Sequence, residues 1–592
     1  MQRSKAPGAE RPSAAEYGSD VIVEVLKELG IPFVALNPGA SFRGLHDSLV
    51  NFQGGGPEML LCPHEEIAVA IAHGYARATG KPMACALHDV VGLQHGTMAI
   101  FNAWCDRTPI IVLGGTGPMD SSLRRPYIDW VHTALVQGNQ VRDYVKWDDQ
   151  PGSVAAIPES VLRGYRIATT EPQGPVYLCF DVETQEEKIS QPMDLPNVAR
   201  FAPPASPTAD PSLLYEAARL LVRAEWPVIV ADNVGRHPGA IKALVELAEL
   251  LGAGVVDGGR RFNFPSTHPL DVTLSREEAL ADADVLLGLD VVDLGGASSG
   301  VKDRSMLDSP LYAPLTVIHI SLSDLLQHSW ATDVQRLHPV DIPIAADTAE
   351  ALPQLVELCR KELAGDSTRQ QRIEARRQRV EAMNKQGREK VQQQIRSAWD
   401  LKPISAARLY GELWELIKGR TWSLLSASGR LPVRSIWDFT EAQQFLAGGG
   451  GGGLGYATGS SLGAALAFKG TGRTCVSVVG DGEFMMTPNA LWTASHHELP
   501  LLMVIFNNRS YYNDEGHQEY IAVQRNRPVE NKGVGIHITD PDSDYAALAR
   551  SFSVAGFGPV DDPAQLRGVL AEALKVVDSG KPALVDVRTQ PR

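Results

Sequence analysis

The chain has 592 residues, a formal net charge of −15 at pH 7, 44% hydrophobic and 21% charged residues. This length is enough for about three or four domains, and the composition is that of an ordinary globular protein. The acidic balance argues against a general nucleic-acid binder, because phosphate backbones are held by an excess of lysine and arginine. It does not exclude a local pocket for an anion.

Six cysteines are scattered along the chain and include no C-x-x-C pair. This spacing predicts neither a disulfide framework nor a zinc cluster, and it is typical of a reducing compartment. The polar segment 1–15 lacks the apolar stretch of a signal peptide, and no apolar run is long enough to span a bilayer. We therefore expect a cytoplasmic protein that binds neither membranes nor nucleic acid.

Strand-like and helix-like segments alternate from about residue 19 onward. The first unit has short apolar strands and helical periods, at 32–36, 64–79, 83–87, 96–104, 110–113 and 176–181. A second unit follows the proline-rich stretch 201–210, with strands near 227–231, 285–289 and 315–320. A third unit runs from about residue 403 to the end. The pattern predicts an α/β protein of three doubly wound parallel-sheet domains.

These patterns divide the chain into four parts, at 17–190, 205–365, 366–402 and 403–592. The third part is dense in charged residues, and we interpret it as a connecting helix; a disordered charged linker is the alternative. The glycine run Gly448–Gly453 is either a flexible linker or a tight loop that faces a ligand. We favour the loop, because small-residue helical patterning resumes directly at Leu454.

The strongest motif lies between residues 474 and 508. A β-rich run ends in Gly480-Asp481-Gly482, a helix follows, and an apolar strand then ends in Asn507-Asn508. Ligands bind at the carboxyl edge of such sheets, and Mg²⁺ prefers hard oxygen ligands such as carboxylate, amide and carbonyl. Asp481 and Asn508, which are 508 − 481 = 27 positions apart, can supply two of them, and a backbone carbonyl near Ser510 a third. The flanking glycines let the backbone approach a diphosphate closely.

This motif resembles that of the thiamine-diphosphate-dependent decarboxylases and acetolactate synthases, and the resemblance extends over nearly the whole chain. The segments 490–494 and 452–456 are most similar to benzoylformate decarboxylase. The resemblance implies pyrimidine-binding, central and diphosphate-binding domains, in that order, with thiamine diphosphate and Mg²⁺ as cofactors. It implies that Asp481, Asn508 and the Ser510 carbonyl bind the metal. It also implies that the following residues contact the cofactor: Ser426, Ser428, Gly452 through its carbonyl, Leu454 as a bulky support, Gly480, Gly482 and Glu483.

Thiamine chemistry needs a carboxyl group that drives the cofactor's aminopyrimidine into its imino form, and an apolar pocket that raises the carboxyl pKa assists this. The candidate is Glu65, which directly follows His64 as in the family pattern. An acid at the start of a helix can also serve the helix dipole alone, and Glu66 is a competing candidate. Because the metal motif is present downstream, we favour Glu65 as a catalytic and cofactor-binding residue.

His88 ends a strand 23 positions after Glu65 (88 − 65 = 23), where benzoylformate decarboxylase also has a histidine. We interpret it as a catalytic proton carrier, with a purely structural strand-end histidine as the alternative. The sequence also departs from the family: Ala40 stands between Gly39 and Ser41, where serine often follows directly. The segment 288–293 lacks the second histidine of benzoylformate decarboxylase, which argues against benzoylformate as the substrate.

We therefore expect an enzyme that cleaves or forms a carbon–carbon bond next to a carbonyl, foremost a 2-oxo-acid decarboxylase. The alternatives are an acetolactate-synthase-like carboligase or C–C lyase and, less favoured, a non-catalytic cofactor-binding protein. The partners would be a small 2-oxo acid or related carbonyl compound. The resemblance further implies a homodimer or homotetramer with active sites between chains. The sequence does not decide whether the central domain binds FAD or ADP.

Overall fold

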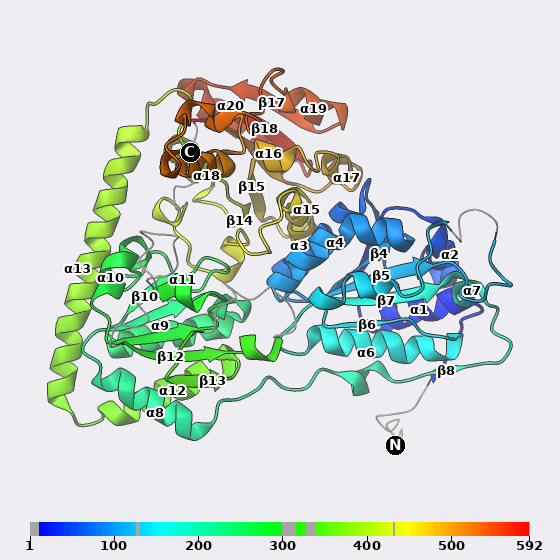
Figure 1. Ribbon diagram of the computed structural model, residues 1–592, viewed down its shortest axis with the longest axis horizontal. Coiled ribbons are helices and arrows are strands. Elements are labelled where there is room, and N and C mark those ends of the chain that lie inside the picture. The colour runs from blue at the N-terminus through cyan, green and yellow to red at the C-terminus, as the bar shows by residue number, and fades with distance from the viewer. Residues whose placement is uncertain (1–10, 126–130, 299–314, 327–337, 430–432, 591–592) are drawn as a thin grey trace.

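The computed structural model describes residues 11–125, 131–298, 315–326, 338–429 and 433–590. These residues form three parallel α/β units, and one long helix runs along the side of the molecule (Figure 1). The expected α/β class with doubly wound parallel sheets is confirmed. The strands of each large sheet lie within one of the ranges 17–190, 205–365 and 403–592, while the boundaries themselves stay predictions.

The first unit has a six-stranded sheet of order β3-β2-β4-β5-β7-β6, in which every neighbouring pair is parallel. Its strands are β2 (Phe33–Leu36), β3 (Glu58–Leu61), β4 (Met83–Leu87), β5 (Ile110–Thr116), β6 (Trp147–Asp149) and β7 (Val176–Asp181). Its helices are α1 (Gly18–Glu28), α2 (Arg43–Asn51), α3 (Glu65–Thr79), α4 (Asp89–Cys105), α6 (Ile157–Thr169) and α7 (Val182–Glu186). The short strands β1 (Arg11–Pro12) and β8 (Asp194–Leu195) pair antiparallel beside it.

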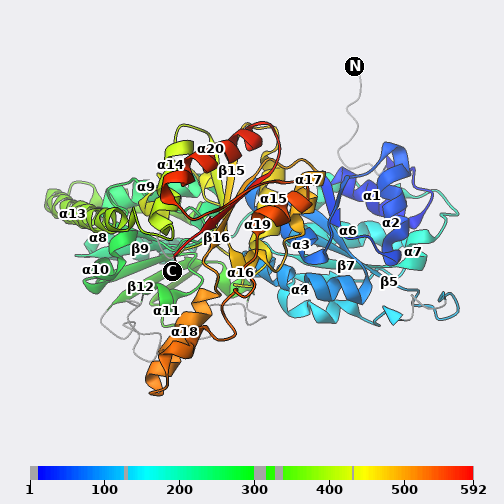
Figure 2. The same cartoon turned by 90° about the horizontal axis from the view of Figure 1, so that it is seen from above.

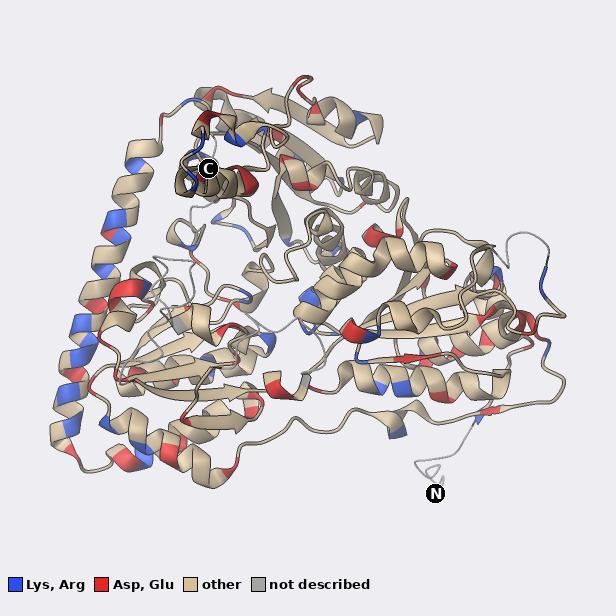
Figure 3. Ribbon diagram, in the orientation of Figure 1, with Lys and Arg blue, Asp and Glu red and all other residues tan. Residues whose placement is uncertain are grey.

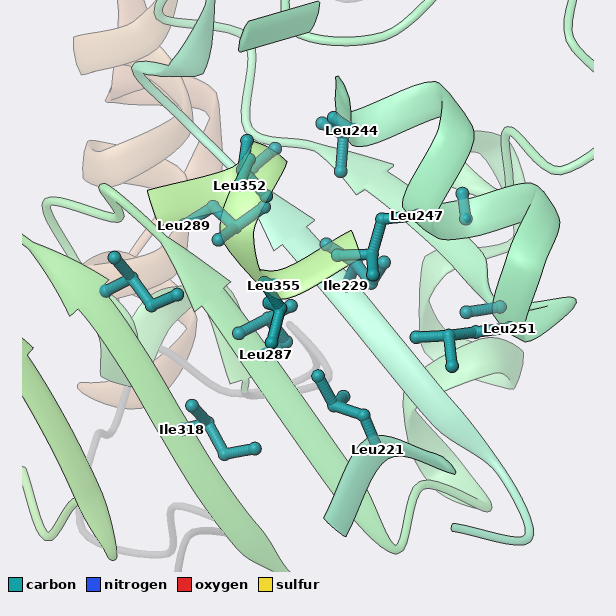
Figure 4. Close-up of a cluster of buried hydrophobic side chains, with 14 of the residues drawn as sticks. Leu221, Ile229, Leu244, Leu247, Leu251, Leu287, Leu289, Ile318, Leu352 and Leu355 are labelled. Atoms are coloured by element: carbon teal, nitrogen blue, oxygen red, sulfur yellow. The ribbon is translucent and has the colours of Figure 1, made fainter. Parts of the chain in front are cut away.

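The central unit has a five-stranded parallel sheet of order β10-β9-β11-β12-β13. Its elements are β9 (Pro227–Ala231), β10 (Gly254–Asp257), β11 (Val285–Leu289), β12 (Thr316–Ser321), β13 (Ile342–Ala345), α8 (Pro211–Arg223), α9 (Pro238–Leu251), α10 (Arg276–Ala281), α11 (Leu294–Ser298) and α12 (Thr348–Leu363). Leucines of α9 and α12 pack on isoleucines and leucines of the strands (Figure 4). Burial of these apolar side chains is the main stabilising contribution of the unit.

The third unit has a five-stranded parallel sheet of order β14-β15-β16-β18-β17. Its elements are β14 (Trp422–Ser426), β15 (Thr474–Gly480), β16 (Leu502–Asn507), β17 (Ala555–Val560), β18 (Ala583–Arg588), α14 (Ala406–Ile417), α15 (Tyr456–Phe468), α16 (Asp481–Phe484), α17 (Ala490–His496), α18 (Tyr512–Gln524), α19 (Tyr545–Ser551) and α20 (Pro563–Asp578). Helix α18 projects away from the body of the molecule (Figure 2).

The segment expected as a connecting helix contains α13 (Ser367–Ala398), a single helix of 32 residues. Blue and red residues alternate along its length in Figure 3, as expected for a largely solvated helix. It is held to the central unit by Arg376, whose guanidinium donates to the carbonyls of Leu251 and Ala224. Within the described residues, no helix combines the length and the apolar character that crossing a membrane requires.

Helices α3 and α15 join the first and third units and make the most extensive helix–helix contact of the described residues. Small residues make this approach possible. A Cβ on Gly74 would lie 1.9 Å from the Ser460 carbonyl oxygen, and a Cβ on Gly463 would lie 2.0 Å from the Ile71 carbonyl oxygen. The two units that carry the sequence motifs are therefore in contact within one chain.

Candidate active site

Asp481 lies at the carboxyl edge of the third sheet, where it begins α16 directly after β15. It is 1% exposed, and its Oδ2 has no hydrogen-bond partner among the described residues. Burial raises the pKa of this carboxyl to about 7, although the backbone amides of Gly482 and Arg509 lower it. A buried carboxylate oxygen without a partner is costly unless a cation binds it. This donor therefore fits a hard divalent cation.

Asn508 and Ser510 follow the neighbouring strand β16. Gly480 pairs with Phe506 in the parallel register of β15 and β16, so Asp481 and Asn508 reach the same edge of the sheet. The Asn508 Oδ1 accepts the Ser510 N–H at 3.1 Å, across Arg509 with its positive φ of 57°. The Ser510 side chain donates to Glu515 at 3.0 Å, which holds this turn in place. The structure thus brings the three predicted metal ligands to one sheet edge.

The predicted diphosphate contacts lie around the same edge, but some of their side chains already make hydrogen bonds within the protein. Ser428 is buried beside Gly480, with its Oγ 3.7 Å from the position of a Cβ there. The Ser426 hydroxyl instead donates to the Val478 carbonyl at 3.2 Å, inside the sheet. Glu483 accepts the N–H of Ala457 at 3.0 Å, at the start of α15.

Two further predicted cofactor contacts, Gly452 and Leu454, precede α15. Gly452 has a φ of +75°, which an L-residue rarely adopts, and a Cβ there would meet nothing within 4 Å. Leu454 exposes 45% of its surface. Met485 and Met486, which directly follow α16, are also exposed, and a Cβ on Gly455 would lie 3.2 Å from that of Met486. An uncovered apolar surface therefore adjoins the predicted metal ligands.

Glu65 is the first residue of α3 and is 5% exposed. Its Oε2 lies 3.0 Å from His95 Nδ1, and a Cβ on Gly92 would lie 3.2 Å from its Oε1. Glu66 takes a different direction: its Oε1 lies 3.4 Å from the position of a Cβ on Gly455 in the third unit. Burial raises the pKa of Glu66. The carboxyl groups of Glu65 and Glu66 therefore face different surroundings.

His88 caps α4 and contacts two residues distant in sequence. Its Nδ1 lies 2.9 Å from the Ser41 Oγ, and its Nε2 lies 3.2 Å from the His132 Nδ1. Burial lowers the pKa of His88, and the neighbouring imidazole of His132 lowers it further. A proton can therefore be transferred between the imidazole rings of His88 and His132. Ser41, which stands one position later than the family pattern predicts, therefore contacts His88.

Three of these contact residues were not singled out as site residues from the sequence: Ser41, His95 and His132. Ser41 had appeared only as a departure from the family pattern. His95 and His132 carried no local signal, because their contacts with Glu65 and His88 depend on how helices and loops fold back.

The carboxyl edge of the central sheet is filled by ion pairs. Asp290 follows β11 and binds Arg107 of the first unit at 2.6 Å and Arg236 at 3.1 Å. Arg236 also binds Glu171 of the first unit. These charges join two units, and they occupy the edge at which doubly wound sheets bind ligands.

Comparisons with known proteins match each of the three units. Residues 17–138 match the N-terminal thiamine pyrophosphate binding domain of thiamine pyrophosphate enzymes, 214–355 their central domain and 428–587 their C-terminal binding domain. The acetolactate synthase isozyme 3 large subunit of Escherichia coli (strain K12) is 25% identical, over 96% of this chain and 94% of that protein. The benzoylformate decarboxylase of Pseudomonas aeruginosa is 24% identical, over 96% and 98%.

Solved structures share the fold. The crystal structure of benzoylformate decarboxylase from Polynucleobacter necessarius superposes with a TM-score of 0.75 at 18% identity, covering 98% of this chain and 99% of that one. The three matched domains lie in the order expected from the motifs and together span most of the chain. The buried carboxylate of Asp481, whose Oδ2 has no partner among the described residues, and the glycines around it fit the cofactor that such domains bind. The chain therefore belongs to the thiamine pyrophosphate enzymes, with thiamine diphosphate as its cofactor.

Proposed function

We propose that this chain is a thiamine-diphosphate- and Mg²⁺-dependent 2-oxo-acid decarboxylase. The observation that carries the proposal is the buried Oδ2 of Asp481, which lacks a hydrogen-bond partner among the described residues at the carboxyl edge of its sheet. Retention of Glu65 at the buried start of α3 supports catalysis over mere cofactor binding.

In this proposal Asp481, Asn508 and the Ser510 carbonyl would hold Mg²⁺, which would supply positive charge beside the diphosphate. Ser426, Ser428, Gly480, Gly482 and Glu483 surround the diphosphate, while the Gly452 carbonyl and Leu454 orient the cofactor. Ser428 and Gly480 are the best supported of these contacts, because the Ser426 hydroxyl and the Glu483 carboxylate are already engaged.

Bound thiamine diphosphate supplies an electron sink for the carbanion equivalent that forms when a 2-oxo acid loses CO₂. The chain supplies proton transfers. Glu65 holds a proton towards the aminopyrimidine, and His88 accepts and returns protons at the substrate oxygen. The contact between His88 and His132 supports such a role, because two adjacent imidazoles give the proton a second site.

A second function, carboligation as in acetolactate synthases or C–C bond lysis, is supported by the 25% identity to an acetolactate synthase subunit. The substrate class in either case is a small 2-oxo acid or related carbonyl compound. A cytoplasmic location completes the proposal and is supported by the six cysteines, which are all free.

We also propose a homodimer or homotetramer with active sites between chains. Large apolar side chains stay uncovered near the candidate site in a single chain, among them Leu454 and Met486 at 45% and 50% exposure. Exposed apolar groups gathered in one region favour a protein partner.

The test is a substrate screen with pyruvate, benzoylformate and branched 2-oxo acids. Released CO₂ and carbon–carbon-bonded products are measured in parallel, with Asp481→Ala as the control that removes the metal anchor. We expect CO₂ from at least one acid in the parent and none in the variant. New carbon–carbon bonds would favour the carboligase, whereas neither product from any acid would contradict both functions.

A further inference from the structure

At three positions of the glycine run Gly448–Gly453, a side chain would clash with residues of helix α4 or with Asp106, which follows that helix. A Cβ on Gly449 would lie 2.0 Å from Asp106 Oδ1, and one on Gly451 would lie 2.3 Å from the Phe101 ring. A Cβ on Gly453 would lie 2.2 Å from Met98. The run therefore follows one face of α4 from its C-terminal end towards its middle. Glycine is required here by close approach.

Two side chains of that face bind the run directly. Asp106 Oδ1 accepts the N–H of Gly450 at 2.7 Å, and Asn102 Oδ1 accepts the N–H of Gly451 at 2.8 Å. The two acceptors are four residues apart, so they lie on the same face at the end of α4. Both side chains are buried, at 1% and 2% exposure. Two consecutive amides of the run are thus fixed from another domain.

Asp106 is itself held in place. His73 Nε2 lies 2.9 Å from its Oδ2, and Arg77 binds the same oxygen. Burial alone would raise the pKa of Asp106, but Arg77 and His73 hold it well below its usual range. Arg77 also donates to the carbonyl of Gly448, the first residue of the run. The acceptor is therefore a fixed carboxylate at any neutral pH.

We propose that Asn102 and Asp106 are positioning residues that fix the direction of the Gly452 carbonyl towards the aminopyrimidine of the cofactor. The proposal rests on the function proposed above. Gly452 lies between Gly451, whose N–H is held by Asn102, and Gly453, which lies against Met98, so the chain is held against α4 on both sides of it. Helix α4, with Asp106 directly after it, thus holds the two residues that precede Gly452 in the same chain.

The test begins on the cofactor-free protein, by hydrogen exchange of the amides in residues 448–453. The variant Asn102→Leu removes the acceptor, while Asn102→Asp keeps an oxygen at that place. Thr493→Val is the matched control, because it removes a different hydrogen bond between the units, to the Leu61 carbonyl. We expect exchange to rise about tenfold in Asn102→Leu, as the loss of one hydrogen bond implies. The other two variants should exchange as the parent does.

The second arm measures thiamine diphosphate affinity by calorimetry and H/D exchange at the cofactor C2 by NMR. We expect about tenfold weaker binding and slower C2 exchange in Asn102→Leu, with recovery in Asn102→Asp. If Asn102→Leu does not fold, Asn102→Ala replaces it. Unchanged amide exchange, or raised amide exchange with parent-like affinity and C2 exchange, would overturn the proposal. A parent protein that binds no thiamine diphosphate would instead overturn the proposed function, and this inference with it.

Discussion

Glu65 and Glu66 are neighbours in sequence, yet their carboxyl groups point to different surroundings. Glu65 faces Gly92 and His95 of α4, whereas Glu66 faces Gly455 of the third unit. This divergence makes Glu66 a matched control for the proposed role of Glu65. The sequence favours Glu65 over Glu66 through the family pattern, and substitution of each residue tests that choice.

Glu65→Gln should bind thiamine diphosphate with parent-like affinity but lose H/D exchange at the cofactor C2. An amide can hydrogen-bond to the aminopyrimidine, but it cannot donate and recover a proton. Exchange is followed by NMR on the quenched cofactor, with Glu66→Gln measured beside it. Parent-like exchange in Glu65→Gln together with a loss in Glu66→Gln would transfer the role to Glu66.

His88→Ala should slow turnover by about a hundredfold or more, the usual worth of a positioned acid–base group. Cofactor affinity should stay close to that of the parent, because the proposed diphosphate and metal contacts lie on another unit. Turnover of the folded fraction and the melting temperature are measured on one preparation. An unstable variant whose folded fraction turns over normally would make His88 a structural residue, held by Ser41 and His132.

Local motifs predicted the residues whose placement follows from a strand end, such as Asp481 and Asn508. Parallel strands bring their carboxyl ends together whatever the rest of the fold does. His132 could not be predicted in this way. It reaches His88 because the chain after β5 returns over the start of α4, where the Val90 N–H donates to the His132 carbonyl. Such contacts depend on loop paths that no periodicity encodes.

At the scale of elements, the strands of the sheets could be predicted from the sequence, whereas the contacts between units could not. Strand positions followed from short apolar runs, because parallel strands are buried on both faces. The glycine run was open to two interpretations, since its composition suits both a flexible linker and a tight loop. Its contacts with Asn102 and Asp106 come from another unit and become visible only when the two units are packed together.

Gly74→Ala should destabilise the contact between α3 and α15. The new Cβ would lie 1.9 Å from the backbone oxygen of Ser460, which cannot move without shifting the helix. Overpacking of this kind costs about 1–3 kcal/mol of unfolding free energy. Gly568→Ala is the control, because Gly568 lies in helix α20 with open space around it and the substitution should be neutral or slightly stabilising. Urea unfolding gives the unfolding free energy of each variant. Equal values would mean that α3 and α15 can move apart without a loss of stability.

At the scale of the whole molecule, ion pairs join the first and central units around His237. Its Nε2 lies 3.4 Å from Glu171 of the first unit and 3.5 Å from Asp347 of the central unit. The neighbouring carboxylates of Asp347 and Glu171 raise the pKa of His237 to about 9. Protonated His237 therefore bridges two carboxylates across the boundary between units.

This bridge predicts a pH dependence of stability. The folded pKa exceeds the unfolded value of about 6.5, so its contribution is complete below that value and is lost as pH rises through about 9. The melting temperature of the parent should fall more between pH 7 and pH 9.5 than that of His237→Gln. Calorimetry at the two pH values checks this, and parallel pH profiles would mean that His237 is neutral in the folded protein.

The last prediction concerns which chains build one active site. In a single chain α3 packs on α15, so the two units that carry the candidate halves are in contact. In the proposed dimer the halves come from different chains, so Glu65 of one copy would face the metal ligands of the other. Mixing Glu65→Gln chains with Asp481→Ala chains distinguishes the arrangements, because each variant alone lacks one half.

If the site lies between chains, a mixed dimer has one site with both defects and one intact site. Random dimers should then recover about a quarter of the parent's activity, since half are mixed and each mixed dimer regains one of two sites. Two differently sized tags verify by native mass spectrometry that mixed dimers form. Mixed dimers without activity would mean that each site is completed within its own chain, through the contact of α3 with α15 seen here.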